Sequence, residues 1–132
     1  MFMLDTNIIS DLVRHPRGLA AERLAEVRGG EVATSVVVAG ELRYGCRKRA
    51  SARLTDRVEA VLREIAVLTL GPDASSFYGE IRCHLEARGT PIGQNDLWIA
   101  AQARAAGAVL VTDNGGEFGR IEGLVTENWI RG

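Results

Sequence analysis

The amino-acid sequence predicts an α/β fold with a central, mostly parallel sheet of four or five strands. Short apolar stretches alternate along the chain with longer stretches in which apolar residues recur at helical spacing, an order typical of strands joined by crossover helices. Several crossovers contain two consecutive helices, more than a minimal doubly wound fold requires. With 132 residues, of which 46% are hydrophobic, the chain can bury one core, and we expect residues 1–132 to form a single domain.

The first half of the chain contains two expected strands, each followed by two helices. Pro16 and Gly18 stop the first helix, and Gly29 and Gly30 stop the second, because both residue types interrupt helical periodicity. Ser35 ends the second strand and is a favourable N-cap for the helix after it. The expected elements are strand 2–5, helices 6–14 and 19–28, strand 31–35, and helices 36–47 and 52–64.

The second half of the chain alternates more simply. The Gly-Pro-Asp turn at 71–73 opens a helix, Gly107 closes another, and "AVLVT" at 108–112 is the strongest strand pattern in the chain. We expect strand 66–70, a helix from the turn to Ala87, a loop at 88–96, helix 97–107, strand 108–112, a turn at 113–121 that could include one helical turn, and a short strand within 123–129.

Charge and cysteine content narrow the class of protein. Lys and Arg total 16 against 17 Asp and Glu, a net charge of −1 that neither indicates nor excludes a nucleic-acid partner. Cys46 and Cys83 are too few for a disulfide framework and lack zinc-site spacing, so we expect both to be small core residues in a reducing compartment. Neither a membrane span nor a signal peptide is recognisable, and we expect a cytoplasmic protein with no membrane contact.

Four acidic residues stand at separate expected elements. Asp5 ends the first strand, Asp113 follows strand 108–112, and Asp96 precedes helix 97–107. Sites in open parallel sheets form beyond the carboxyl ends of the strands, so these carboxylates are expected at one edge. Glu41 lies on a partly apolar helix face, where an unpaired carboxylate is costly. An ionised cluster of this kind requires a cation, and oxygen ligands without His or Cys favour Mg²⁺ or Mn²⁺ over zinc.

Each acid also has an ordinary explanation. Asp5 could accept hydrogen bonds at the start of its own helix, and Asp96 could be a first-turn charge that complements a helix dipole. Asp113 lies in a turn-forming Asp-Asn-Gly sequence, and Glu41 could extend into solvent or pair with a nearby arginine. The presence of four acids at the ends of separate elements, two of them on apolar faces, favours a shared site.

Four sequence blocks occur in order over essentially the whole length of the chain. They are "MLDTNIIS" at 3–10, "TSVVVAGELRYG" at 34–45, "PIGQNDLWIAAQA" at 91–103 and "LVTDNGGEFGRIEGLVTENW" at 110–129. In these blocks the chain resembles the PIN domain ribonucleases, in particular the VapC-type toxins of bacterial toxin–antitoxin pairs. The resemblance implies a three-layer α/β/α fold around the sheet, with an acidic pocket that binds Mg²⁺ or Mn²⁺.

The resemblance also implies roles for single residues. Asp5 and Asp96 match the main metal ligands of the family, and Glu41 matches the helix glutamate that completes the core of the site. Thr6 and Asn7 match the same motif, and we expect them to position the acids through hydrogen bonds.

The fourth acid of the expected site is either Asp113 or Glu117. Toxins of this type often read Thr-Asn-Asn where this chain reads Thr-Asp-Asn at 112–114. We favour Asp113 as a catalytic residue and metal ligand because it directly follows a strand, with Glu117 as second choice. Thr112 is expected to position the acids as Thr6 does.

The implied reaction is metal-assisted hydrolysis of an RNA phosphodiester bond, with transfer RNA among the family's substrates. A basic cluster continues the Glu41 helix outward and is expected to contact RNA phosphates, although a solvated helix face is the alternative. This cluster consists of Arg43, Arg47, Lys48 and Arg49. The implied partners are a small antitoxin protein, which inhibits the toxin and so relieves its block of translation, and a second copy of the chain in a homodimer.

Three other functions are alternatives to an RNA nuclease. A non-catalytic binding module could keep the same fold, and a DNA nuclease could use the same pocket. A phosphatase of the haloacid dehalogenase type also begins with a strand that ends in Asp, but it needs a second Asp where this chain has Asn7, and it needs a downstream Lys, for which Lys48 is the one candidate.

Overall fold

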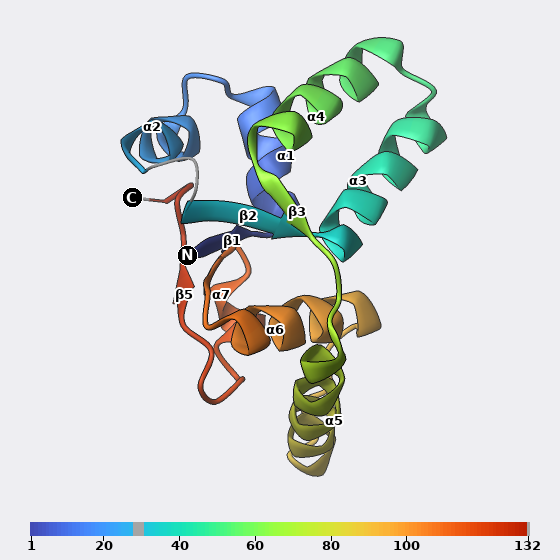
Figure 1. The fold of residues 1–132 in the computed structure, drawn as a ribbon, viewed down its shortest axis with the longest axis vertical. Helices are drawn as coiled ribbons and strands as arrows, with labels where there is room; N and C mark the ends of the chain where they lie inside the picture. The colour runs from blue at the N-terminus through green and yellow to red at the C-terminus, as the bar shows by residue number, and fades with distance from the viewer. Residues whose placement is uncertain (28–30, 132) are drawn as a thin grey trace.

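A five-stranded parallel sheet forms the centre of the molecule in a computed structural model that describes residues 1–27 and 31–131 (Figure 1). The strand order is β3-β2-β1-β4-β5, and every neighbouring pair is parallel. The α/β prediction is therefore confirmed, and the sheet is parallel throughout rather than mostly so. The strands are β1 (Phe2–Leu4), β2 (Val32–Ser35), β3 (Ala66–Leu68), β4 (Val109–Val111) and β5 (Thr126–Glu127).

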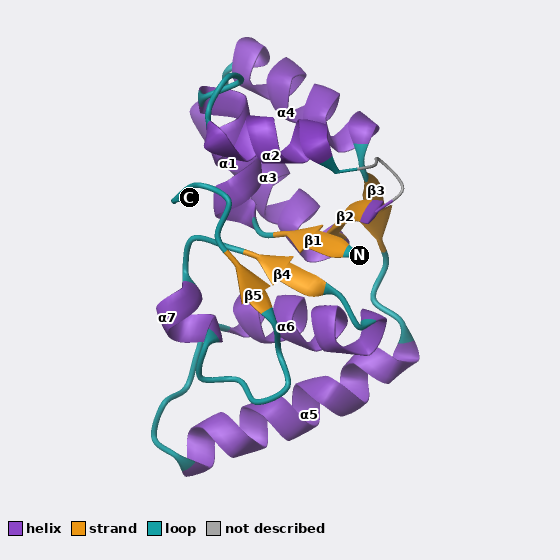
Figure 2. Cartoon of the chain, turned by 90° about the vertical axis from the view of Figure 1, so that its left-hand side faces the viewer, coloured by secondary structure: helices purple, strands orange, loops and turns teal. Residues whose placement is uncertain are grey.

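Helices cover both faces of the sheet and complete three layers (Figure 2). One layer holds α1 (Thr6–Arg14), α2 (Leu19–Glu26), α3 (Val36–Arg49) and α4 (Ala52–Glu64). The other holds α5 (Pro72–Ala87), α6 (Gln94–Ala106) and the short α7 (Gly115–Phe118). Helices on both faces bury the inner strands of a parallel sheet, which is why β1 and β4 read as continuous apolar runs.

The central strand β1 lies at the point where the strand order reverses. From β1 the chain adds β2 and β3 on one side and β4 and β5 on the other. Met3 and Leu4 of this strand are fully buried, as are Ile8 of α1 and Ile99 of α6 on the layers above and below. A ligand site in an open parallel sheet is expected beyond the carboxyl end of the strands at such a reversal, which here is the position of Asp5.

One helix boundary that matters for the site differs from expectation. Helix α6 begins at Gln94, so the last three residues of the expected loop 88–96 belong to its first turn, because extended Gly93 (φ −62°, ψ 154°) acts as the N-cap. The turn at 113–121 includes the one helical turn that the sequence allowed for, which is α7. Ser35 caps α3 as predicted, its Oγ accepting the Val37 N–H at 3.0 Å. The predicted helix stop at Gly29 and Gly30 lies outside the described residues.

The two cysteines differ in burial. Cys46 is buried, as predicted, but Cys83 is exposed. Ile81 and Leu85 define the buried face of α5, and a residue two positions from each lies on the opposite side of a helix. In the part of the chain that the structure describes, no helix has both the length and the apolar composition needed to cross a lipid bilayer.

Candidate metal centre

Asp5 is the innermost acid of the candidate site, with 4% of its surface exposed. Its Oδ1 accepts the Thr6 N–H at 2.8 Å, so it caps α1, while its Oδ2 accepts the Thr112 hydroxyl at 2.8 Å and the Asn7 amide at 3.4 Å. Burial raises the pKa of the Asp5 carboxyl; hydrogen bonds from Thr112 and Thr6 lower it, and the charges of neighbouring glutamates raise it further. The ordinary capping role is real, but it occupies one of two carboxylate oxygens.

Asp96 lies in the first turn of α6 and is partly buried. Burial is the largest cause that raises its pKa to about 6, followed by the negative charges of Asp5, Glu117 and Glu41 and a hydrogen bond with Glu117. Four carboxylates contributed by four segments of the chain therefore feel one another's charge. They form one electrostatic cluster, called here the acid cluster: Asp5, Glu41, Asp96 and Glu117.

Glu41 projects from α3 and is held on both carboxylate oxygens. Oε1 accepts the Thr6 hydroxyl at 2.7 Å, and Oε2 accepts the Asn95 amide at 3.3 Å. Asn95 lies beside Asp96 and has no role in the expectations from sequence. The sequence hints at a role for Asn95 only through its position beside Asp96 in the first turn of a helix. Its contact with Glu41 joins residues 54 positions apart, which no local pattern predicts.

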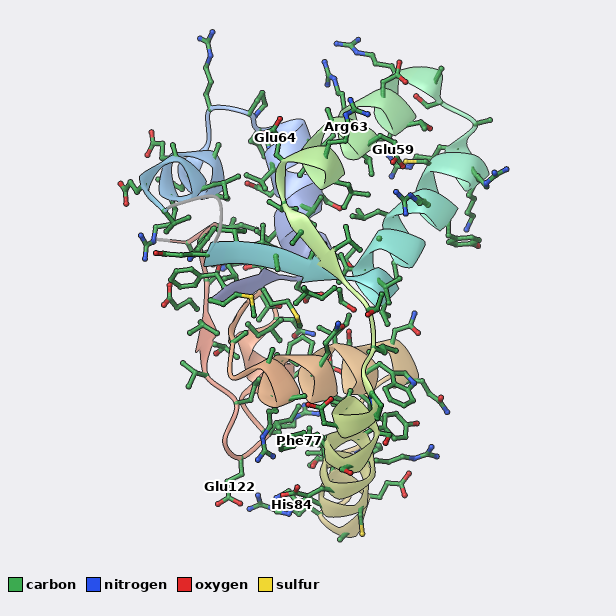
Figure 3. The ribbon with its side chains drawn as sticks, in the orientation of Figure 1. Glu59, Arg63, Glu64, Phe77, His84 and Glu122 are labelled. Carbon is green, nitrogen blue, oxygen red and sulfur yellow. The ribbon has the colours of Figure 1, made fainter. Side chains whose placement is uncertain are left out.

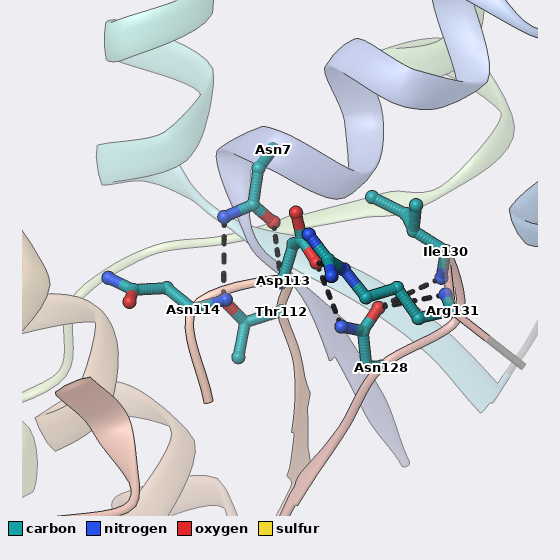
Figure 4. A network of polar contacts seen from close by, with 7 residues as sticks. All are labelled: Asn7, Thr112, Asp113, Asn114, Asn128, Ile130 and Arg131. Carbon is teal, nitrogen blue, oxygen red and sulfur yellow. Dashed lines mark hydrogen bonds and ion pairs between the residues drawn. The ribbon is translucent and has the colours of Figure 1, made fainter. Parts of the chain in front are cut away.

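Asp113 lies at the same edge of the sheet but faces away from the acid cluster. Its Oδ1 accepts the Asn128 amide at 2.9 Å and the Arg131 Nε–H at 3.0 Å (Figure 4). The hydrogen bond from Asn128 is the largest cause that lowers the pKa of Asp113, and Arg131 adds to it. Asp113 therefore already has a positively charged partner in the protein, Arg131.

Glu117, the second choice from sequence, occupies the fourth position of the acid cluster. It lies on α7, and its carboxylate accepts a hydrogen bond from the Asn114 amide. Its charge raises the pKa of both Asp5 and Asp96. The structure therefore brings Glu117, rather than Asp113, together with the other three acids, because the helical turn of α7 directs its side chain back towards α6.

The hydrogen-bond donors around the acid cluster share one property, which is that all of them are neutral. Within the described ranges, no Lys, Arg or His forms an ion pair with any of the four acids. Neutral donors orient a carboxylate without cancelling its charge, so the cluster keeps an unbalanced negative charge. The donor side chains are Thr6, Asn7, Asn95, Thr112 and Asn114.

The acid cluster opens to solvent between α3 and α6. An open cavity of about 420 Å³ is lined by Glu41, Asp96 and residues 93–95. As the side chains stand, no three acids, His or Cys among the described residues converge closely enough to hold one ion in common. The oxygen donors are nonetheless those that suit Mg²⁺ or Mn²⁺, and the side chains of Glu41 and Glu117 can rotate between staggered conformations to bring their oxygens closer to the other acids.

A second hollow, called here the α1–α3–α4 groove, begins at the acid cluster. It measures about 290 Å³, starts at Thr6 and Glu41, and runs between the three helices to Arg14 and Arg49. Its lining between these ends is largely apolar and includes Leu42, Cys46, Leu54 and Val58.

The basic cluster expected from sequence is only partly available. The Arg43 guanidinium forms two hydrogen bonds of 2.9 Å with Glu59, which lies on the side of α4 that faces α3 (Figure 3). Lys48 Nζ lies 6.0 Å from the centre of the Tyr44 ring. Arg47 and Arg49 are exposed and, across the described residues, form no ion pair. Arg43 thus has less free charge to offer than the other three.

Carboxylates without cation partners at the carboxyl edge of a parallel α/β sheet are typical of a class of proteins that hold divalent cations with acidic side chains, and many hydrolases belong to this class. Comparison with known proteins narrows this class. The family model described as "PIN domain" matches residues 2–124. The chain therefore belongs to the PIN domain family, and its curated relatives place it among the VapC ribonucleases of that family.

These relatives match the chain over nearly its whole length. It is 35% identical over 131 residues to Ribonuclease VapC2 of Rickettsia felis, with 98% of each protein covered. It is 36% identical over 132 residues to the tRNA(fMet)-specific endonuclease VapC of Shigella flexneri, with 97% of each covered. The crystal structure of VapBC2 from Rickettsia felis bound to a promoter DNA fragment contains a chain with a TM-score of 0.90 and 34% identity, covering 97% of this chain and 98% of that one.

The raised pKa of Asp96 predicts how stability depends on pH in the absence of divalent ions. The unfolded chain loses this proton near pH 3.8 and the folded chain near pH 6, so the free energy of unfolding should fall as pH rises between these values and level off above pH 6. Urea denaturation in EDTA at several pH values from about 4.5 to 7.5 measures this. Asp96→Asn should flatten the fall, whereas an equally steep fall in that variant would contradict the assignment.

Proposed function

We propose that this protein is a Mg²⁺- or Mn²⁺-dependent endoribonuclease whose metal ligands are Asp5, Glu41, Asp96 and Glu117, within a single PIN domain that spans residues 1–132. The observation that carries the proposal is the acid cluster itself: four carboxylates feel one another's charge, and every side chain that donates to them is neutral. Nucleases of the PIN family generally depend on divalent metal ions, which agrees with this donor set.

Residues around the acid cluster prepare the site for hydrolysis. Thr112 and the Thr6 backbone fix the Asp5 carboxylate, and the Thr6 hydroxyl together with Asn95 holds Glu41 beside it, so rotation of the glutamate side chains is the main reorganisation that ion binding requires. A divalent ion held by these four carboxylates would lower the pKa of a water molecule and would neutralise negative charge that develops on the leaving oxygen.

Hydrolysis by water leaves a 5′-phosphate and a 3′-hydroxyl on the cleaved RNA. The alternative, attack by the RNA 2′-oxygen with histidine acid–base catalysis, has no support in the geometry. His15 lies 4.0 Å from Asp11 at the end of α1, and His84 contacts Arg88 on α5, so the two rings belong to opposite layers of the fold.

The substrate that we propose is transfer RNA. The Shigella flexneri relative is specific for tRNA(fMet), and this chain shares its length and over a third of its residues. Arg47, Lys48 and Arg49 follow Glu41 along α3 by roughly 9–12 Å of helix axis, a distance that suits contact with phosphates flanking the cleaved bond.

We also propose that the protein is a toxin that acts in the cytoplasm and inhibits translation until an antitoxin neutralises it. The relative from Rickettsia felis was solved as VapBC2. The α1–α3–α4 groove beside the acid cluster, apolar in its middle and with arginine at its far end, suits an antitoxin segment with apolar and acidic residues. We further propose that the toxin pairs with a second copy of itself, as the resemblance to the VapC-type toxins implies.

Removal of one central ligand should abolish cleavage without unfolding the protein. Asp5→Asn and Asp96→Asn are each expected to lower the rate of tRNA cleavage in Mg²⁺ by more than about 100-fold, since even partners that only orient metal ligands cost 10–100-fold. Purified protein, tRNA and 5′-end analysis of the products measure this, with EDTA-treated wild type as reference. Full activity of either variant, or of wild type in EDTA, would contradict the proposal.

The choice between the two candidates for the fourth acid can be measured directly. Glu117→Gln should lower the cleavage rate by on the order of tenfold or more, because it removes a charge from the acid cluster. Asp113→Asn should cost less, since the Asp113 carboxylate is already paired with Arg131. A larger loss of cleavage rate for Asp113→Asn than for Glu117→Gln would indicate that Asp113, and not Glu117, is the fourth metal ligand.

Phosphate contacts by the basic cluster should show in the salt dependence of RNA binding. In the Asp96→Asn background, Arg47→Ala is expected to reduce the slope of log affinity against log salt by about one. Arg17→Ala, in the exposed loop between α1 and α2, removes the same charge elsewhere and serves as the control. Equal slopes in the two variants would mean that Arg47 faces solvent in the complex.

A further inference from the structure

The segment that follows β5 lies beside Asp113, the residue that directly follows Thr112 (Figure 4). Asn128 and Arg131 in this segment donate to the same oxygen of Asp113, at 2.9 Å and 3.0 Å. Asn128 Oδ1 accepts the backbone N–H groups of Ile130 at 2.9 Å and Arg131 at 3.4 Å, which shapes the segment into a turn. Asn128 therefore uses its amide oxygen to build the turn and its amide nitrogen to hold Asp113.

The turn is fixed to the body of the protein by its aromatic residue. Trp129 is 5% exposed and packs edge-to-face against Phe2 of β1, with ring centres 5.3 Å apart. The Arg23 guanidinium lies over both rings, at 5.7 Å from Phe2 and 5.6 Å from Trp129. Burial of two aromatic rings gives Asn128 a rigid base from which to act.

Asp113 in turn fixes Asn7, a residue inside the site. The Asp113 backbone N–H donates to Asn7 Oδ1 at 3.0 Å. An amide whose oxygen accepts on one side must present its nitrogen on the other, and Asn7 Nδ2 lies 3.4 Å from Asp5 Oδ2 and 3.5 Å from Thr112 Oγ1. The position of Asp113 thus determines which end of Asn7 faces Asp5.

The loop after β4 continues the same network to Glu117. Thr112 Oγ1 donates to Asp5 and accepts the Asn114 N–H at 3.0 Å, and the Asn114 side chain donates to Glu117. A continuous set of hydrogen bonds therefore runs from the turn after β5, through Asp113, to two members of the acid cluster.

We infer that Asn128 and Arg131 are positioning residues for the nuclease reaction, which clamp Asp113 so that it faces away from the pocket while Glu117 faces into it. The inference rests on the function proposed above. Without the clamp, an ionised Asp113 next to a cation site would be attracted to the bound cation, and its movement would pull its own N–H away from Asn7. The clamp thereby sets both the identity of the fourth acid and the orientation of Asn7.

An exchange of two side chains tests the clamp. In Asn128→Asp the new carboxylate faces the carboxylate of Asp113, and Arg131 is the one cation of the clamp between them. The repulsion between the two carboxylates should open the clamp. In the double variant Asp113→Asn/Asn128→Asp the amide and the carboxylate trade places: one oxygen of the new carboxylate can still accept the Ile130 and Arg131 N–H groups and the other can accept from the new amide. The single variant should raise the Mg²⁺ concentration for half-maximal tRNA cleavage by on the order of tenfold, and the exchange should restore most of the loss.

A second readout does not depend on activity. Isothermal titration of each variant with MgCl₂, without RNA, should show the same order of affinity: wild type, then the exchange, then Asn128→Asp. Circular dichroism checks that each variant is folded, and if Asn128→Asp is not, Arg131→Ala takes its place with an expected smaller loss. Arg120→Ala, exposed after α7 and without an ion pair among the described residues, is the matched control and should behave as wild type.

The outcomes separate the clamp from the proposed function. The clamp would be overturned if Asn128→Asp showed the same Mg²⁺ dependence as wild type, or if the exchange variant were as impaired as Asn128→Asp. In either case, cleavage of RNA by the wild-type protein would still support the proposed nuclease function. Failure of wild type itself to bind Mg²⁺ and cleave RNA would overturn the proposed function instead.

Discussion

Mutual repulsion among carboxylates at one edge of a sheet is the constraint on which the architecture of this protein depends. Bringing four acids together opposes folding unless their charge is relieved. Burial of the charged carboxylates adds to this cost, and it also raises the pKa of Asp5 and Asp96. An arginine would relieve the repulsion permanently and would leave no charge for a ligand. Threonine and asparagine side chains orient the oxygens while leaving their charge available. The protein therefore keeps an unfavourable arrangement that a divalent cation can stabilise.

The topology explains how such distant residues meet. Because β1 is central, Asp5 emerges in the middle of the carboxyl edge, and α3 begins at the same edge directly after β2. Helix α6 starts there from the opposite layer, so Glu41 and Asp96 approach Asp5 from the two faces of the sheet. Each acid lies on or directly beside an element that also buries apolar residues in the core, such as Leu42 of α3, Leu97 of α6 and Phe118 of α7, and these anchor the site.

Sequence reasoning succeeds where one local rule decides the position. Asp5 follows an apolar strand and Asp96 opens an apolar helix, so topology alone brings both to the carboxyl edge. It does not resolve the choice between Asp113 and Glu117, because the partners that turn Asp113 away lie 15 and 18 residues further along. The same limit explains Asn95, whose contact with Glu41 spans two layers, and Arg43, whose partner Glu59 lies on the next helix. Alternation of strands and helices predicts the fold because it repeats along the whole chain; side-chain pairing does not repeat.

Two aspartates at the same edge of the sheet differ in the partners that surround them. The pKa of Asp96 is raised to about 6, with burial as the largest cause, while the pKa of Asp113 is lowered by Asn128 and Arg131. Both residues satisfy the rule that sites form beyond strand ends, so that rule cannot tell them apart. The chemistry of the partner does: a carboxylate with its own guanidinium gains little from a second cation, whereas one surrounded by other carboxylates and neutral donors gains much. Assigning the site by partner chemistry rather than by position along the chain leads to Glu117, and it explains why an additional acid can stand beside the pocket without joining it.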